Sequence, residues 1–288
     1  MKNLAINKMH SSEAAWFFIK LSLLFFFLSN MFIMMADVSS ACPFPVGVCK
    51  LNSFSILFSL PGKVLLHVLL LVLAPFYLFE KKMFYVTLGL FFLSCIIISY
   101  HESNGRFHHA TIFSPIFAAQ SFAYWKKRSR PEFDLVQYRV QYSIQMIAAT
   151  YTLAGISKLA TSGFGWINSG EVFALQVVKN YSFIYFAQGT KAALDHGYHI
   201  ARLMLEHQYL IRFFLASSLL LELFCFAALI SNSVRRWYAL GLLLMHTGIW
   251  LLMGIPFGVV AMPMIIFFLN PLYWLYKQVA GVISSAKV

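Results

Sequence analysis

The sequence predicts an all-α, polytopic membrane protein, and its composition is the first reason. Hydrophobic residues make up 60% of the 288 residues, charged residues only 11%, and the mean hydropathy is +0.73. Such a chain is too apolar for one soluble core. Its apolar runs continue over roughly 20 residues, which suits membrane helices, whereas a transmembrane barrel would alternate apolar and polar residues.

The second reason is the placement of the positive charges, which sum to a net +12. A basic balance indicates nucleic acid when the cations share a solvated face, but here they stand between apolar runs. Lys and Arg in such places set membrane orientation, because cytoplasmic loops retain them. We therefore expect the lipid bilayer as a partner and no nucleic acid.

Basic residues at alternate ends of the apolar runs predict about eight spans, with both termini in the cytoplasm and no separate signal peptide. The inner ends carry the N-terminal lysines, Lys81-Lys82, the cluster from Lys126 to Arg130, Arg235-Arg236 and Lys277. The expected spans cover residues 14–36, 62–79, 83–100, 110–125, 137–160 and 209–232, and two more lie within 237–276 on either side of a turn at Gly254-Ile255-Pro256.

We interpret residues 1–288 as a single membrane-embedded domain. Between residues 161 and 208 no apolar run is long enough to cross a bilayer. This segment is expected on the outer side, with amphipathic helices that lie against the membrane or cap the bundle.

Cys42 and Cys49 bracket a Pro- and Gly-rich turn in the expected first outer loop. A short closed loop of this kind favours a disulfide in an oxidising compartment. The alternative is a catalytic dithiol, although redox sites usually have the tighter Cys-x-x-Cys spacing. No second Cys pair or nearby His completes a tetrahedral site, so no metal is expected.

Lys158 is a cation within an apolar run that afterwards breaks up in glycine. A cation at membrane depth costs on the order of 3 kcal/mol, so it is a functional hypothesis by default. If Lys158 points into the bundle, desolvation favours its neutral amine and makes it a candidate base. If it points to lipid, it only snorkels to the headgroups. Tyr151, seven residues earlier, shares its helix face.

Glu222 and His246 also fall within expected spans. An unpaired carboxylate is very unfavourable there, so we expect Glu222 to be protonated or paired with a polar group. The candidate partners are Gln141, Gln145, His67 and Lys158. For Glu222, structural pairing and proton relay both stay open. His246 is either an ordinary hydrogen-bonded buried histidine or a proton-transfer group.

The stretch from Tyr151 to Gly170 resembles the membrane domain shared by the vitamin K-dependent gamma-carboxylase and its bacterial relatives, the HTTM (horizontally transferred transmembrane) family. The pattern is an aromatic residue, then Ala154-Gly155-x-x-Lys158-Leu159 and, after a Gly-rich gap, Trp166-x-x-x-Gly170. His246 followed by Met253-Gly254-Ile255-Pro256-Phe257 is similar to the family's histidine span and the turn after it.

The resemblance implies that Lys158 is a base that deprotonates a reduced, vitamin K-like quinone at the outer face, so that the quinone reacts with oxygen. His246 would be its polarising or proton-transfer partner. Glu222 and Tyr151 complete the expected catalytic group. Substrate binding is expected from four further residues: Trp166, His101, His108 and Gln145.

In size and in its expected outer Cys pair, the chain is similar to the sporulation-delaying-protein B-like members, which mature a secreted toxin peptide. This implies a bacterial cell membrane, a secreted peptide substrate and a co-encoded maturation partner. The 288 residues leave no room for the carboxylase's large lumenal domain, so glutamate carboxylation itself is not expected. The alternative is a non-enzymatic transporter or assembly subunit in which Glu222 and His246 handle protons or are structural.

Overall fold

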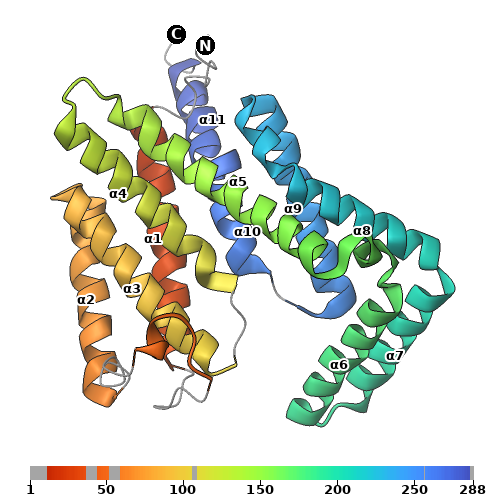
Figure 1. The fold of residues 1–288 in the computed structure, drawn as a ribbon. Coiled ribbons are helices and arrows are strands. Elements are labelled where there is room, and N and C mark those ends of the chain that lie inside the picture. The colour runs from red at the N-terminus through yellow and green to blue at the C-terminus, as the bar shows by residue number, and fades with distance from the viewer. Residues whose placement is uncertain (1–11, 37–43, 52–58, 106–108, 256, 286–288) are drawn as a thin grey trace. The chain divides into compact units, whose positions relative to one another are not determined.

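A computed structural model describes residues 12–36, 44–51, 59–105, 109–255 and 257–285, and every regular element in these ranges is helical (Figure 1). The all-α prediction is therefore confirmed for the described chain. The helices long and apolar enough to cross a membrane are Glu13–Ala36, Leu60–Leu78, Met83–Ser103 and Gly258–Ala280. A helical membrane protein fits these four, while the expected count of about eight spans and the cytoplasmic termini remain predictions.

The chain divides into two compact units. Unit 1 comprises Met1–Ile147 and Met262–Val288, and unit 2 comprises Ala148–Ala261. Helix α5, Leu135–Ser162, contributes residues to both units, as does α10, Gly258–Met264. The expected single domain over residues 1–288 stays a prediction.

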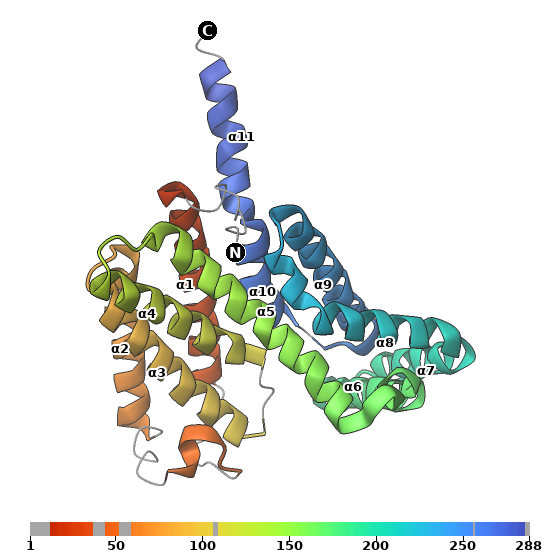
Figure 2. The same ribbon diagram turned by 45° about the horizontal axis from the view of Figure 1, so that its top comes forward.

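Unit 1 is a helical bundle in which α1, Glu13–Ala36, contacts several neighbours (Figure 2). These are α2 (Leu60–Leu78), α3 (Met83–Ser103), the π-helix η7 (Ile265–Leu269) and α11 (Pro271–Ser285), and α4 (Phe113–Ser129) packs along α3. Phe27 of α1 packs edge-on against Phe113 and Phe117 of α4, with ring centroids 5.5 and 4.8 Å apart. Such aromatic pairs add to the stabilisation from burial.

Local sequence explains the helix ends of unit 1. The Ser59 hydroxyl accepts a hydrogen bond from Gly62 N–H at 3.4 Å, and a proline stands in the first turn of α2, both typical of a helix start. Glu80 and Lys82 have φ of 55° and 50°, so the tight turn from α2 to α3 uses left-handed backbone. Short 3₁₀ helices, Gly47–Lys50 (η2) and His109–Ile112 (η4), precede α2 and α4.

Unit 2 contains the end of α5 and a hairpin of α6 (Gly170–Gln188) and α7 (Lys191–Glu206). The 3₁₀ helix Gly163–Asn168 (η5) joins α5 to α6, and α8 (Gln208–Leu223) and α9 (Asn232–Met253) follow the hairpin. The buried residues of α7 recur at helical spacing and make it amphipathic, as expected for the 161–208 segment: Gly197, Ile200, Ala201 and Met204. Its outer location stays a prediction.

The predicted sixth span, residues 209–232, is not one helix. Helix α8 ends at Leu223, the 3₁₀ helix Cys225–Leu229 (η6) follows, and α9 begins after Ser231, whose hydroxyl accepts a hydrogen bond from Val234 N–H at 3.2 Å. Hydropathy does not reveal this break, because the residues across it are still apolar. The break after α9 is confirmed: Gly254, with φ 67°, closes the helix in the left-handed region that favours glycine.

Candidate functional site

The predicted catalytic residues Lys158 and Glu222 form an ion pair within unit 2. Lys158, near the end of α5, donates a hydrogen bond from Nζ to Oε2 of Glu222 on α8 at 2.5 Å. The Glu222 side chain is 7% exposed and that of Lys158 is 25% exposed. A buried carboxylate without a partner is strongly unfavourable, so Lys158 explains how Glu222 is accommodated.

Gly155 explains why α5 and α8 approach so closely at this pair. A Cβ added at Gly155 would lie 2.9 Å from the backbone nitrogen of Leu223 and 3.2 Å from Cβ of Glu222. Small residues let helix backbones come together, and here a backbone atom leaves no room for a side chain. The glycine one turn before Lys158 therefore positions the ion pair.

Trp166, in η5, covers the Lys158 ammonium. Nζ of Lys158 lies 5.0 Å from the centroid of the indole ring, within the range of a cation–π interaction. Phe173 of α6 packs edge-on against the indole at 5.2 Å and fixes its position. Nε1 of Trp166 is buried and donates no hydrogen bond within the described chain. The indole thus contacts the cation, and its buried N–H is left without an acceptor among the described residues.

Tyr151 and His246 form a second pair in unit 2. The Tyr151 hydroxyl lies 2.9 Å from Nε2 of His246, and the two residues are 3% and 7% exposed. Phe257 stacks on the imidazole with ring centroids 5.2 Å apart and an interplanar angle of 25°. An imidazole exchanges protons near neutral pH, and a hydroxyl can donate to it or accept from it. The pair is therefore chemically able to pass a proton.

The residues expected to bind substrate are divided between the two units. Trp166 belongs to unit 2 and contacts Lys158. His101, on α3, and Gln145, on α5, belong to unit 1. His108 lies outside the described residues, so substrate binding by these three stays a prediction.

The expected disulfide also stays a prediction, because Cys42 lies outside the described residues. Cys49 is buried in η2. The cysteines of the described chain, Cys49, Cys95 and Cys225, form no disulfide with one another.

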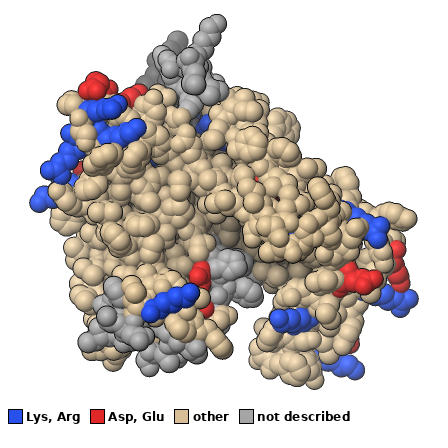
Figure 3. All heavy atoms as spheres, in the orientation of Figure 1, with Lys and Arg blue, Asp and Glu red and all other residues tan. Residues whose placement is uncertain are grey.

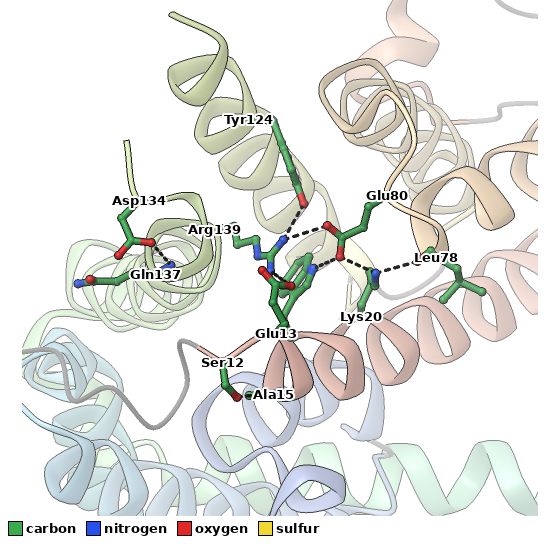
Figure 4. Close-up of polar contacts among 11 residues, drawn as sticks. Ser12, Glu13, Ala15, Lys20, Leu78, Glu80, Tyr124, Asp134, Gln137 and Arg139 are labelled. Carbon is green, nitrogen blue, oxygen red and sulfur yellow. Dashed lines mark hydrogen bonds and ion pairs between the residues drawn. The ribbon is translucent and has the colours of Figure 1, made fainter. Parts of the chain in front are cut away.

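Sequence reasoning missed an ionic network in unit 1, centred on Glu80 (Figure 4). Oε1 of Glu80 accepts hydrogen bonds from Nζ of Lys20 at 2.7 Å and Nε1 of Trp16 at 2.9 Å. Its Oε2 accepts from Nη1 of Arg139 at 3.1 Å, and Arg139 Nη2 also donates to Glu13 at 2.7 Å. The available signal is Arg139 itself, a cation inside the predicted fifth span.

Glu80 neutralises cations that the fold buries. Lys20 and Arg139 are 3% and 1% exposed. Partial burial raises the pKa of Glu80, but the hydrogen bond from Lys20 and the charges of Arg139 and Lys20 outweigh it and hold the pKa below its ordinary value. Several exposed cations of unit 1 gather where α4 and α5 are joined (Figure 3). The network contains two carboxylates, Glu13 and Glu80, and two cations, Lys20 and Arg139. Its ion pairs connect α1, the α2–α3 turn and α5.

The candidate site of unit 2 is thus a cation held between a carboxylate and an indole, accompanied by a buried hydroxyl–imidazole pair. Both pairs join segments that are distant in the sequence, and both contain groups able to exchange protons. No family model matches this chain, and no curated protein or solved structure matches it either.

Proposed function

We propose that this chain is a multi-pass membrane protein of the HTTM, vitamin K-dependent carboxylase-like type, in which Lys158 acts as the base in a quinone-linked modification or maturation of a secreted peptide. The observation that carries the proposal is the Lys158 ammonium, which is partly exposed and held between Glu222 and Trp166. The motif from Tyr151 to Gly170, with the resemblance it bears, supports the same assignment.

The Lys158–Glu222 pair suits a base because the proton has a place to go. Burial of the Glu222 carboxylate removes much of the solvation that favours an ammonium–carboxylate pair over the neutral amine and carboxylic acid. Transfer of the proton from Nζ to Oε2 of Glu222 leaves a free amine, which can then accept a proton from an acidic O–H group. Glu222 therefore serves as the proton store and Lys158 as the base.

The surroundings of Lys158 fit a reduced quinone. The aromatic indole of Trp166 lies beside the amine, and aromatic rings of this kind pack well against a flat quinol ring. A bound quinol would supply the acidic hydroxyl and the electrons that oxygen accepts. The chain's own residues would orient it, remove its proton and hold that proton on Nζ or Glu222. Tyr151 and His246 form a second place where a proton can rest.

Membrane location is part of the same proposal. The positive-inside pattern predicts that Lys158 lies near the outer end of its span. The resemblance implies a bacterial cell membrane and a secreted peptide substrate on that side. Cysteine-accessibility labelling of single-Cys variants tests it: a Cys at Ser162 should react with an impermeant reagent in intact cells. A Cys at Ser129 should react only after permeabilisation.

Lys158→Arg tests the base directly. Arginine keeps the positive charge toward Glu222 but stays protonated, so it cannot accept a proton. The purified full chain, in lipid nanodiscs with a reduced naphthoquinone and oxygen, should convert quinol and oxygen to quinone epoxide and water. Mass spectrometry should detect epoxide with wild type and with Lys179→Arg, an exposed lysine of α6, but not with Lys158→Arg. Full epoxide formation by Lys158→Arg would exclude Lys158 as the base.

A second candidate function is a non-enzymatic transporter or assembly subunit that handles protons. The burial of Glu222, Tyr151 and His246 favours it, since these groups exchange protons away from bulk water. On this alternative, Glu222→Gln should impair function more than Lys158→Arg, with no chemical change in any substrate. Proton flux into vesicles containing the purified protein, measured with a pH-sensitive dye, separates the two functions.

A further inference from the structure

Arg235 is a buried cation that has no acidic partner among the described residues of the chain. Its side chain is 2% exposed, and Nε donates a hydrogen bond to the Ala228 carbonyl at 3.3 Å. Nη1 is buried and meets no hydrogen-bond acceptor within the described chain. Because a guanidinium stays protonated in proteins, this is a full positive charge without a compensating negative one.

The surroundings of Arg235 add to the positive potential. Arg235 lies in the first turn of α9, where the helix dipole favours negative charge. Ser231 already accepts hydrogen bonds from the N–H groups of Val234 and Arg235, which leaves those of Asn232 and Ser233 at this end. Asn232, three residues earlier on the same side of the helix, has a buried side-chain amide atom that is also unpartnered within the described chain. A flip of the Asn232 side-chain amide exchanges its Oδ1 and Nδ2 atoms, so Asn232 can present an N–H donor at the unpartnered position. The Arg235 guanidinium, the N-terminus of α9 and the Asn232 amide would all favour binding of a negatively charged group with oxygen acceptors.

We propose that Arg235, Asn232 and the N-terminus of α9 bind the phosphate group of an anionic phospholipid. Arginine holds a phosphate with parallel N–H donors, and helix N-termini bind phosphates through backbone N–H groups. Trp237, two residues on, is 70% exposed, as is typical of side chains at the headgroup level of a membrane. The charge pattern places this end of α9 at the cytoplasmic leaflet, where anionic lipids are met. The proposal is independent of the role of Lys158.

Asn232→Asp tests the site without removing the cation. The new carboxylate, three residues from Arg235 and in the first turn of α9, supplies the missing negative charge from within the chain. We expect the variant to be more stable than wild type in lipid-free detergent and to bind phosphatidylglycerol at least about tenfold more weakly. Ser233→Asp is the matched control. Ser233 is exposed, so this substitution adds the same negative charge to the same helical turn but on a different side of the helix.

The measurement is the apparent Tm of the purified full chain in a non-ionic detergent, with phosphatidylglycerol, diacylglycerol or inorganic phosphate added. Phosphatidylglycerol should raise the Tm of wild type and Ser233→Asp by several degrees and leave Asn232→Asp unchanged, while diacylglycerol, which lacks the phosphate, has no effect. A rise with inorganic phosphate alone would support the phosphate site and identify a free ion as its source.

Two results would overturn the proposal. One is a wild-type Tm that neither phosphatidylglycerol nor phosphate raises; the other is an Asn232→Asp protein that responds as wild type does. Arg235→Met provides a second variant in case Asn232→Asp fails to fold. It removes the buried charge, so it should be at least as stable as wild type without lipid and should not respond to phosphatidylglycerol.

Discussion

Lys158 and Glu222 are 64 positions apart in the chain, yet Nζ of the first lies 2.5 Å from Oε2 of the second. The carboxylate is the more buried partner, and it sits at the C-terminal end of α8, where the helix dipole disfavours negative charge. Glu222 therefore depends on Lys158 more than Lys158 depends on Glu222.

The dependence of Glu222 on Lys158 predicts non-additive stability changes. Lys158→Ala should lower the free energy of unfolding by about 2 kcal/mol, because a buried carboxylate loses its partner. Glu222→Gln should cost less, since Lys158 can still reach water. The double variant should be more stable than the sum predicts, by about 1–2 kcal/mol. Unfolding by denaturant in mixed micelles measures all three, and strictly additive effects would show that the pair contributes no coupling.

Tyr151→Phe should cost about 1 kcal/mol, because it removes the hydroxyl from Nε2 of His246 while keeping the ring. Tyr142→Phe, on the same helix, is the control, since the Tyr142 hydroxyl makes no hydrogen bond within the described chain. The nitrogen chemical shifts of the His246 ring provide a second measurement. They should move in Tyr151→Phe and not in Tyr142→Phe; unchanged shifts in both would disprove the hydrogen bond.

Gly155→Ala should destabilise the protein by about 1–3 kcal/mol, because the new methyl would meet the backbone of Leu223 and force α5 away from α8. Gly248→Ala in α9 is the matched control. A Cβ there has no neighbour within 4 Å, so the better helix propensity of alanine should stabilise by up to about 1 kcal/mol. Opposite signs for the two glycines, measured by the same unfolding assay, are the expected result.

The lowered pKa of Glu80 predicts a loss of stability in acid. The unfolded chain, in which Glu80 has its ordinary pKa, binds more protons than the folded chain as the pH falls, so the free energy of unfolding falls too. Ionised Glu80 makes its full contribution to the free energy of unfolding above its ordinary pKa of 4.5. This contribution is lost as the pH falls through the lowered pKa of Glu80 in the folded chain. Unfolding of wild type and Glu80→Gln between about pH 7 and about pH 3 measures it, and the variant should show a flatter profile.

Glu206 offers the comparison for Glu80. A hydrogen bond from Arg202 lowers its pKa as well, but this pair is exposed. Added salt should therefore weaken the effect of Glu206→Gln on the profile and leave that of Glu80→Gln largely intact. Equal salt sensitivity of the two variants would contradict the buried position of the Glu80 network.

The helical class and several of the helix ends can be predicted from the sequence alone. Unbroken apolar runs predict α1, α2 and α3 to within a few residues, because burial in lipid or in a core requires a self-satisfied backbone. Gly254 marks the end of α9, because a left-handed backbone is a local property of glycine. These features depend on neighbours in the chain, so they can be predicted without knowing the fold.

Which polar groups contact one another could not be predicted from the sequence and is known from the three-dimensional fold. Glu222 had several candidate partners in the sequence, and the contact of α5 with α8 at Gly155 selects Lys158. Arg139 shares Glu80 with Lys20 because α1, α5 and the α2–α3 turn converge there. The interruption of residues 209–232 after Leu223 is likewise invisible to hydropathy. Pairing depends on which helix faces lie opposite each other, and an apolar run of given length is compatible with many such arrangements.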